Sequence, residues 1–288
     1  MAKAKPSLVS SLLEFDQEAI RANEMAVAQE SDEEIVERLR ERFQILTDMT
    51  RAVRKGDVRA MIVSGPPGVG KSFGVEEVLQ KDGIFDVLGE RKPKYEIVKG
   101  AMSAIGLYAK LYEFSDANHV LVFDDCDSIL MEDLSLNILK GALDSSKKRF
   151  ISWNTDSRLL RSEGIPDRFE FKGAAIFITN IKFEHVKSKR LRDHLDALES
   201  RCHYIDLQMD TTREKILRIK QIVNDGMLDA HEFEEPEIAK DDIVKFITDN
   251  KDKLRELSLR MVLKLADLKK SFPANWTAMA RTTCMRRT

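Results

Sequence analysis

The chain has 288 residues, of which 43% are hydrophobic and 33% charged, and its formal net charge is −2. This composition is typical of a folded protein with a solvated surface, and it excludes a general attraction for nucleic acid or acidic lipid. The three cysteines, Cys126, Cys202 and Cys284, lack metal-ligand spacing and indicate free thiols in a reducing interior. No apolar run approaches membrane-spanning length, and Glu14 and Asp16 interrupt the apolar patch that a secretory signal would need. We therefore expect a cytoplasmic protein with no membrane partner.

The first 30 residues are rich in Ala and Ser with weak periodicity, so we expect a loosely held arm over residues 1–30. Ser31 to Glu34 has the Ser-x-x-Glu spacing of a capping box, which marks the start of a helix. Apolar residues then recur every three or four positions up to Val53. This pattern predicts an amphipathic helix that ends at Gly56.

Residues 59–79, RAMIVSGPPGVGKSFGVEEVL, place several Gly and Pro residues between a short apolar strand, Ala60 to Ser64, and a helix that begins near Phe73. The loop fits Gly-x-x-x-x-Gly-Lys-Ser, in which glycine lets the backbone N–H groups turn toward phosphate oxygens. Lys71 would reach the β- and γ-phosphates, and the Ser72 hydroxyl would ligate magnesium. A glycine-rich turn with a chance lysine is the plain alternative. The predicted nucleotide-binding residues are Gly65, Pro66, Pro67, Gly68, Val69, Gly70, Lys71, Ser72 and Phe73.

Short apolar runs then alternate with helical stretches, as expected of an α/β fold whose parallel sheet is buried on both faces. The predicted strands are 60–64, 95–98, 120–123, 175–179 and 204–207. After Met209 the pattern is helical only, through 211–228, 241–250 and 255–270. We expect a nucleotide-binding core over residues 31–208 and a small helical domain with a C-terminal tail over 209–288.

Polar side chains end two of these strands. Asp124 and Asp125 follow strand 120–123, and carboxylates there lie at the edge where open α/β sheets bind ligands. Asp124 would hold Mg²⁺, and Asp125 would polarise the attacking water. Asn180 follows strand 175–179 and could orient a water against the γ-phosphate. A surface Asp pair and an ordinary strand terminator are the alternatives.

The order of GPPGVGKS, LVFDD, FITN, ESRC and an all-helical tail resembles the AAA+ ATPases over residues 35–270. The resemblance implies a P-loop αβα sandwich with a five-stranded parallel sheet, followed by a helical lid. It also implies that ATP and Mg²⁺ bind between core and lid, and that the chain forms a ring-shaped homo-oligomer, which we expect to be a hexamer.

The resemblance assigns a role to each motif. Residues 65–72 take the place of Walker A, residues 120–125 of Walker B and Asn180 of sensor 1. Arg201 takes the place of the arginine finger, which in this family reaches the nucleotide of the neighbouring subunit, and Arg260 that of sensor 2. An arginine suits both roles because its fixed charge stabilises the γ-phosphoryl group, although each could be a solvated helix residue.

At one position the sequence departs from the family, since the second Walker B acid is usually Glu and here it is Asp125. Its side chain is one methylene shorter, which leaves slow turnover or a nucleotide-gated scaffold as alternatives. Residues 144–173 contain two alternating segments that predict a hairpin, a feature of several DNA-acting branches, or a structural insertion. Residues 100–108 occupy the place of the pore loop in protein-unfolding members, but could equally pack a helix start.

The run KSKRLR, residues 187–192, is either a solvated face or a contact for phosphate backbone. We slightly favour a nucleic-acid motor or loader acting on DNA or RNA. The alternatives are a protein remodeller with a protein substrate and a slowly hydrolysing scaffold. A small-molecule P-loop kinase fits less well, because it would need neither ESRC nor a helical lid.

Overall fold

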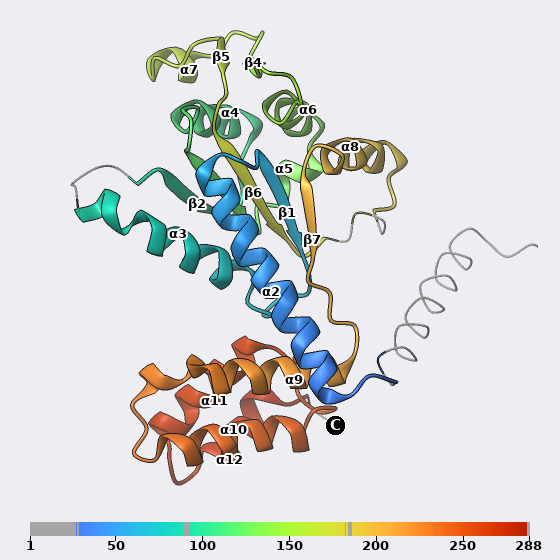
Figure 1. Cartoon of the computed structure of the whole chain (residues 1–288), viewed down its shortest axis with the longest axis vertical. Helices are drawn as coiled ribbons and strands as arrows, with labels where there is room; N and C mark the ends of the chain where they lie inside the picture. The colour runs from blue at the N-terminus through green and yellow to red at the C-terminus, as the bar shows by residue number, and fades with distance from the viewer. Residues whose placement is uncertain (1–26, 28, 89–92, 182, 184–185, 287–288) are drawn as a thin grey trace, which may run out of the picture. The chain divides into compact units, whose positions relative to one another are not determined.

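The computed structural model describes residues 27, 29–88, 93–181, 183 and 186–286, so most of the predicted arm lies outside the described residues (Figure 1). The chain divides into two compact units. Unit 1 comprises Met1–Glu41 and Met209–Thr288, and unit 2 comprises Arg42–Gln208. The boundary falls inside one long helix, which contributes its first part to unit 1 and the rest to unit 2.

Unit 2 is built on a five-stranded sheet in the order β2-β3-β6-β1-β7, in which every neighbouring pair is parallel. The five predicted strands are confirmed to within one residue at each end. Their bounds are Ala60–Ser64 for β1, Tyr95–Lys99 for β2, Val120–Asp124 for β3, Ala174–Thr179 for β6 and His203–Asp206 for β7.

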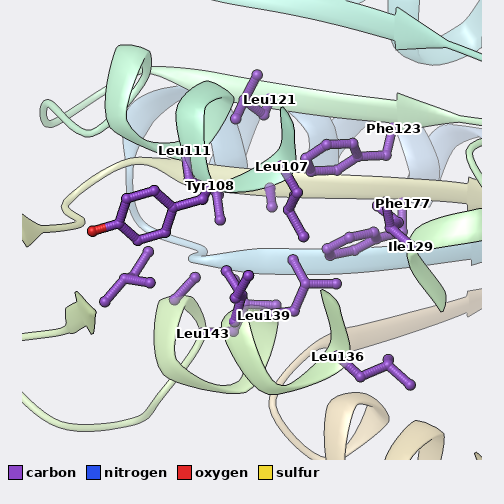
Figure 2. Packing of buried hydrophobic residues seen from close by; sticks show 14 of the residues in the cluster. Leu107, Tyr108, Leu111, Leu121, Phe123, Ile129, Leu136, Leu139, Leu143 and Phe177 are labelled. Atoms are coloured by element: carbon purple, nitrogen blue, oxygen red, sulfur yellow. The ribbon is translucent and has the colours of Figure 1, made fainter. Parts of the chain in front are cut away.

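The three central strands are buried along their whole length, which is why their sequences read as continuous apolar runs. Alternate residues of β1 enter two different clusters, with Ile62 in one and Met61 in the other. Figure 2 shows the first cluster, which contains Leu107 and Leu139 from two covering helices and Phe177 of β6. The second cluster covers the opposite face of the sheet. The predicted αβα sandwich is therefore confirmed.

Helices cover both faces of this sheet (Figure 1). On one face lie α4 (Ala104–Glu113), α6 (Asp133–Ala142) and α8 (Lys189–Glu199), with the short α5 (Ser128–Met131) leading into α6. On the other face lie α3 (Lys71–Leu88) and the second half of α2 (Asp32–Lys55).

The predicted helix over 31–55 is confirmed together with its capping box. The Ser31 N–H donates to Glu34 Oε2 at 2.7 Å, and the Glu34 N–H donates back to Ser31 Oγ at 3.1 Å. The helix stops before Gly56, which adopts φ 84°, a conformation that glycine accepts without a steric cost.

The predicted hairpin is also confirmed. Strands β4 (Phe150–Ser152) and β5 (Arg168–Glu170) pair antiparallel, and the short helix α7 (Arg158–Ser162) lies in their connection. Arg149 fixes the base of the hairpin, since its buried guanidinium donates to the carbonyls of Ala142 and Gly173, each at 2.9 Å. Burial lowers the Arg149 pKa to about 10, which leaves the group charged near neutral pH.

The C-terminal part of unit 1 is helical, as predicted. It contains α9 (Thr212–Ile222), α10 (Pro236–Asp249), α11 (Leu259–Ser271) and α12 (Trp276–Cys284), which share one apolar cluster. The predicted helix 211–228 changes to a π-helical segment at Val223–Met227, where Gly226 adopts φ 100°. Helix α12 was not predicted. Throughout the described ranges, no helix combines the length and the hydrophobicity needed to cross a bilayer.

Candidate functional site

A loop at the carboxyl end of β1 leads directly into helix α3. Gly68 and Gly70 adopt φ 73° and 104°, which only glycine accepts without strain. A Cβ on Gly65 would lie 3.0 Å from the Leu207 carbonyl oxygen, so the loop also needs glycine there to pass a neighbouring backbone. The N-terminus of α3 lies directly behind the loop and favours an anion. Local geometry therefore supports a phosphate-binding role.

The lysine of this loop is 5% exposed and points into a group of oxygens. Lys71 Nζ donates to the carbonyls of Gly65 at 2.7 Å and Pro66 at 2.9 Å, and to Asn180 Oδ1 at 2.7 Å. Its ammonium is thus held over the loop, where phosphate oxygens could exchange with these acceptors. Of the other loop residues, Val69 is buried, Pro67 is exposed and Phe73 is 71% exposed.

A hydroxyl and a carboxylate meet beside the lysine. Ser72 Oγ donates to Asp124 Oδ1 at 2.8 Å, and Asp124 ends β3 with 5% of its surface exposed. Two adjacent ligands of octahedral Mg²⁺, each about 2.0–2.1 Å from the ion, are about 2.9 Å apart. Oxygen donors at the observed spacing therefore fit Mg²⁺, and a small shift of either side chain would complete the fit.

The second aspartate is linked to the lysine through an amide. Asn180 Nδ2 donates to Asp125 Oδ1 at 2.8 Å, while Asn180 Oδ1 accepts from Lys71. These two partners fix which amide atom is oxygen and which is nitrogen. Asp125 is exposed and adopts φ 52°, and its N–H donates to the Ile178 carbonyl at 3.0 Å. The carboxylate is thereby held at the edge of the sheet with one oxygen engaged.

Further side chains at this edge were not predicted as site residues. Thr179 Oγ1 donates to Asp127 Oδ1 at 2.8 Å, and burial, together with the charge of Asp125, raises the pKa of Asp127. Lys99 Nζ lies 3.6 Å from Asp124 Oδ2. The run DDCDS hinted at Asp127, but Lys99 reaches Asp124 through strand register, which sequence does not show.

A pocket of about 710 Å³ adjoins the cluster. Pro66 and Asn180 contribute to its lining from the loop and the end of β6, while Val186, Lys187 and Leu191 contribute from the segment around the start of α8. The basic run 187–192 therefore borders a pocket that reaches the predicted sensor 1 residue.

The two predicted arginines belong to other elements of the chain. Arg201 is half-buried and donates to the Ala197 carbonyl in the preceding turn. Arg260 is exposed in the first turn of α11, which belongs to unit 1. The structure thus brings together Lys71, Ser72 and Asp124 with Asp125 and Asn180, and the finger and sensor 2 roles stay predictions.

No protein-family model matches the chain. Over 254 residues it is 33% identical to an uncharacterized 36.7 kDa protein from the nrdC-mobD intergenic region of Enterobacteria phage T4, a match that covers 87% of this chain and 76% of the relative. The chain belongs to the same family as this phage protein. Because that T4 relative is uncharacterized, membership of its family does not assign an activity to this chain.

Three solved structures are similar in fold. They are NtrX from Brucella abortus in complex with ATP (11% identity, TM-score 0.48), domain III of the replication initiation protein DnaA from Thermotoga maritima (14%, 0.47) and Hsp104 from S. cerevisiae in complex with casein (17%, 0.46). The matches cover 98%, 85% and 86% of this chain, and 62%, 92% and 41% of those chains. The chain thus spans less than two thirds of NtrX and of Hsp104.

All three TM-scores lie below 0.5, so these similarities assign no role to this chain. The αβα fold is seen in the chain's own elements: the five-stranded parallel sheet, the glycine-rich loop after its β1 strand, and the acidic and polar ends of β3 and β6. The αβα sandwich followed by a helical region, which the AAA+ resemblance implies, is confirmed for this member of the T4 protein's family.

Proposed function

We propose that the chain is an AAA+ ATPase that binds ATP with Mg²⁺ and hydrolyses it in a ring-shaped homo-oligomer, a hexamer in our proposal. One observation carries the proposal. Lys71, Asn180 and Asp125 form a continuous hydrogen-bonded chain, and Ser72 with Asp124 forms a second contact beside it. A structural turn would require neither a buried ammonium nor two carboxylates held by hydrogen bonds from Asn180 and Ser72.

The position of each residue suggests its role in ATP binding or hydrolysis. The loop N–H groups and Lys71 would bind the phosphates, and Ser72 with Asp124 would hold the metal. When bound, Mg²⁺ neutralises charge on the β- and γ-phosphates. Asp125 would accept a proton from the attacking water, and Asn180 would orient that water. Since Asn180 bonds both Lys71 and Asp125, phosphate binding at the lysine would reposition the base.

A nucleotide-gated scaffold with slow hydrolysis is a second candidate, and one observation favours it. Asp125 is shorter than the usual glutamate, and its Oδ1 already accepts from the Asn180 amide. That hydrogen bond occupies one acceptor site of the carboxylate and leaves fewer for the attacking water. In this version the chain binds ATP as the proposed ATPase does, and only turnover differs.

Two features favour a nucleic-acid partner. On the hairpin, the Arg168 guanidinium lies 4.4 Å from the centroid of the Phe150 ring, which is 43% exposed, and such a pair suits stacking on bases. At the start of α8, Lys187 and Lys189 are exposed at the positive end of a helix. A phosphate bound there would offset both the side-chain charges and the helix dipole.

The protein-remodelling alternative has weaker support. Met102 and Ile105 are apolar residues of the segment 100–108, which takes the place of a pore loop, and both are half-buried and pack against the apolar cluster of unit 2. Ser103 caps helix α4 by accepting from the Gly106 N–H, so the segment begins a helix. Packing accounts for both apolar residues.

The test measures ATP hydrolysis and nucleic-acid binding together. Wild-type protein should hydrolyse ATP with Mg²⁺, and its binding to single- or double-stranded nucleic acid should weaken steeply with salt. Alanine at four basic positions should lower the affinity for nucleic acid of any base sequence, while basal ATP hydrolysis survives. Each lost phosphate contact should also reduce the slope of log affinity against log salt concentration by about one unit. These positions are Lys187, Lys189, Arg190 and Arg192.

The matched control removes four exposed charges in unit 1, namely Lys245, Lys251, Lys253 and Arg281. Its net charge changes equally, so an equal loss of affinity would show that only overall charge matters. Undetectable binding of either form of nucleic acid at low salt, with an ATP analogue present, would refute the nucleic-acid role. In that case Met102→Ala and Ile105→Ala should be tested for uncoupling of hydrolysis from a protein substrate.

A further inference from the structure

Lys99 lies between two carboxylates at the predicted metal site. It is the last residue of β2 and pairs in register with Asp124 of β3. Its Nζ is 3.6 Å from Asp124 Oδ2 and 3.7 Å from Glu76 Oε2. Both distances exceed hydrogen-bond length, and the Lys99 side chain is 60% exposed. One ammonium is therefore loosely shared by Asp124 and Glu76.

We propose that Lys99 is a positioning residue that competes with Mg²⁺ for Asp124, and that Glu76 draws Lys99 away from it. The Lys99–Glu76 pair would thus set the Mg²⁺ concentration that the site requires for nucleotide binding. This inference rests on the proposed Mg²⁺–ATP site, because Asp124 must be a metal ligand for the competition to occur.

The contacts of Asp124 explain why a competitor matters. Its Oδ1 accepts from Ser72, and its Oδ2 faces Lys99, so both oxygens of a buried carboxylate have polar neighbours. A divalent cation beside Asp124 must either approach the Lys99 ammonium or displace it. The repulsion is moderate, because the exposed lysine head is screened by water.

Helix α3 carries the second carboxylate that Lys99 approaches, Glu76. Ser72 and Glu76 are four residues apart in this helix, so both side chains lie on the same face. Glu76 therefore stands one turn beyond the predicted metal-ligand serine, with its side chain 38% exposed. A lysine stem is flexible enough to exchange partners that are nearly equidistant, and the exchange requires no movement of the backbone.

The test measures binding of a fluorescent, non-hydrolysable ATP analogue at increasing Mg²⁺ concentration. Lys99→Met should lower the half-saturating Mg²⁺ concentration by about threefold to tenfold, because the competing charge is gone. Glu76→Gln should raise it by about twofold to threefold, because Lys99 then has Asp124 alone. In the Lys99→Met background, Glu76→Gln should have little further effect.

Two controls test whether the effect comes from the charge of the Lys99 side chain and from its position beside Asp124. Lys99→Arg keeps the charge and should retain the wild-type Mg²⁺ dependence. Lys81→Met breaks the exposed Lys81–Glu77 pair of the same helix and should change nothing. Thermal unfolding is measured first, to show that each variant is folded and as stable as the wild type.

The outcomes are distinguishable. If the wild type binds the analogue only with Mg²⁺ but Lys99→Met has an unchanged or higher half-saturating concentration, the Lys99 proposal is wrong and the nucleotide site stands. If Glu76→Gln acts equally with and without Lys99, Glu76 attracts the metal directly and the exchange of partners is wrong. If the wild type does not bind the analogue with Mg²⁺, the proposed function fails and the inference fails with it.

Discussion

The Asp125→Asn variant tests the proposed chemistry with little structural disturbance. Asp125 adopts φ 52°, a left-handed conformation that Asn tolerates about as well as Asp does. The Asn180 amide can still donate to the new side-chain oxygen, so the chain of hydrogen bonds from Lys71 is kept. Alanine would be a poorer choice, because it would add backbone strain of about 1–2 kcal/mol.

The expected effect falls on the rate and not on binding. Removing a general base typically costs about 10²- to 10⁴-fold in rate, and we expect the single-turnover rate of Asp125→Asn to fall within that range. Affinity for ATP should change by less than about threefold, because the oxygens that hold Lys71 come from Gly65, Pro66 and Asn180.

The assay combines single-turnover phosphate release with equilibrium binding of a fluorescent nucleotide. Asp127→Asn is the matched control, since its new oxygen can still accept from Thr179, and its rate should stay within about threefold of the wild type. If Asp125→Asn and the wild type have the same single-turnover rate at equal nucleotide occupancy, Asp125 takes no part in hydrolysis. That result would favour the nucleotide-gated scaffold.

Three further predictions concern other parts of the chain. Asp125→Glu carries the same backbone strain as alanine, but a variant that thermal unfolding shows to be folded should hydrolyse ATP as fast as the wild type or faster if the shorter side chain limits the rate; a large decrease in its single-turnover rate would contradict this. Gly173→Ala should lower the free energy of unfolding by about 1–3 kcal/mol, because a Cβ would lie 2.3 Å from the Phe114 carbonyl oxygen; an unchanged denaturation midpoint would contradict this. Arg201→Ala should bind ATP normally but hydrolyse it poorly, and mixing it with Lys71→Ala should restore activity; only the residual parental rates after subunit exchange would argue against a trans finger.

Much of the fold was predictable because its signals are local. Buried parallel strands read as short apolar runs, and the left-handed turns at Gly68 and Gly70 require glycine, so both the sheet and the phosphate loop appear in the sequence. The capping box at Ser31 is local as well. Helix α12 was missed because Thr and Arg residues interrupt its short apolar pattern, and its apolar face becomes evident only through its packing partners.

The part of the site that was not predicted depends on pairing between distant segments. Lys99 meets Asp124 because β2 and β3 pair in one particular register, and a shift of one residue would turn the lysine to the other face. The link from Lys71 through Asn180 to Asp125 likewise joins the start of α3 to the ends of β6 and β3. Residue identities gave the members of this cluster, but only the sheet order shows which of them touch.

The most direct test of the central claim compares ATP binding by the wild type and by Lys71→Ala in the presence of Mg²⁺. Because Lys71 supplies a charged donor at the phosphate loop, its loss should weaken ATP binding by about 10- to 100-fold, with Lys81→Ala as the control that keeps wild-type affinity. Thermal unfolding should show that Lys71→Ala is folded. If a folded Lys71→Ala variant binds ATP with wild-type affinity, the loop does not bind phosphate and the account is wrong.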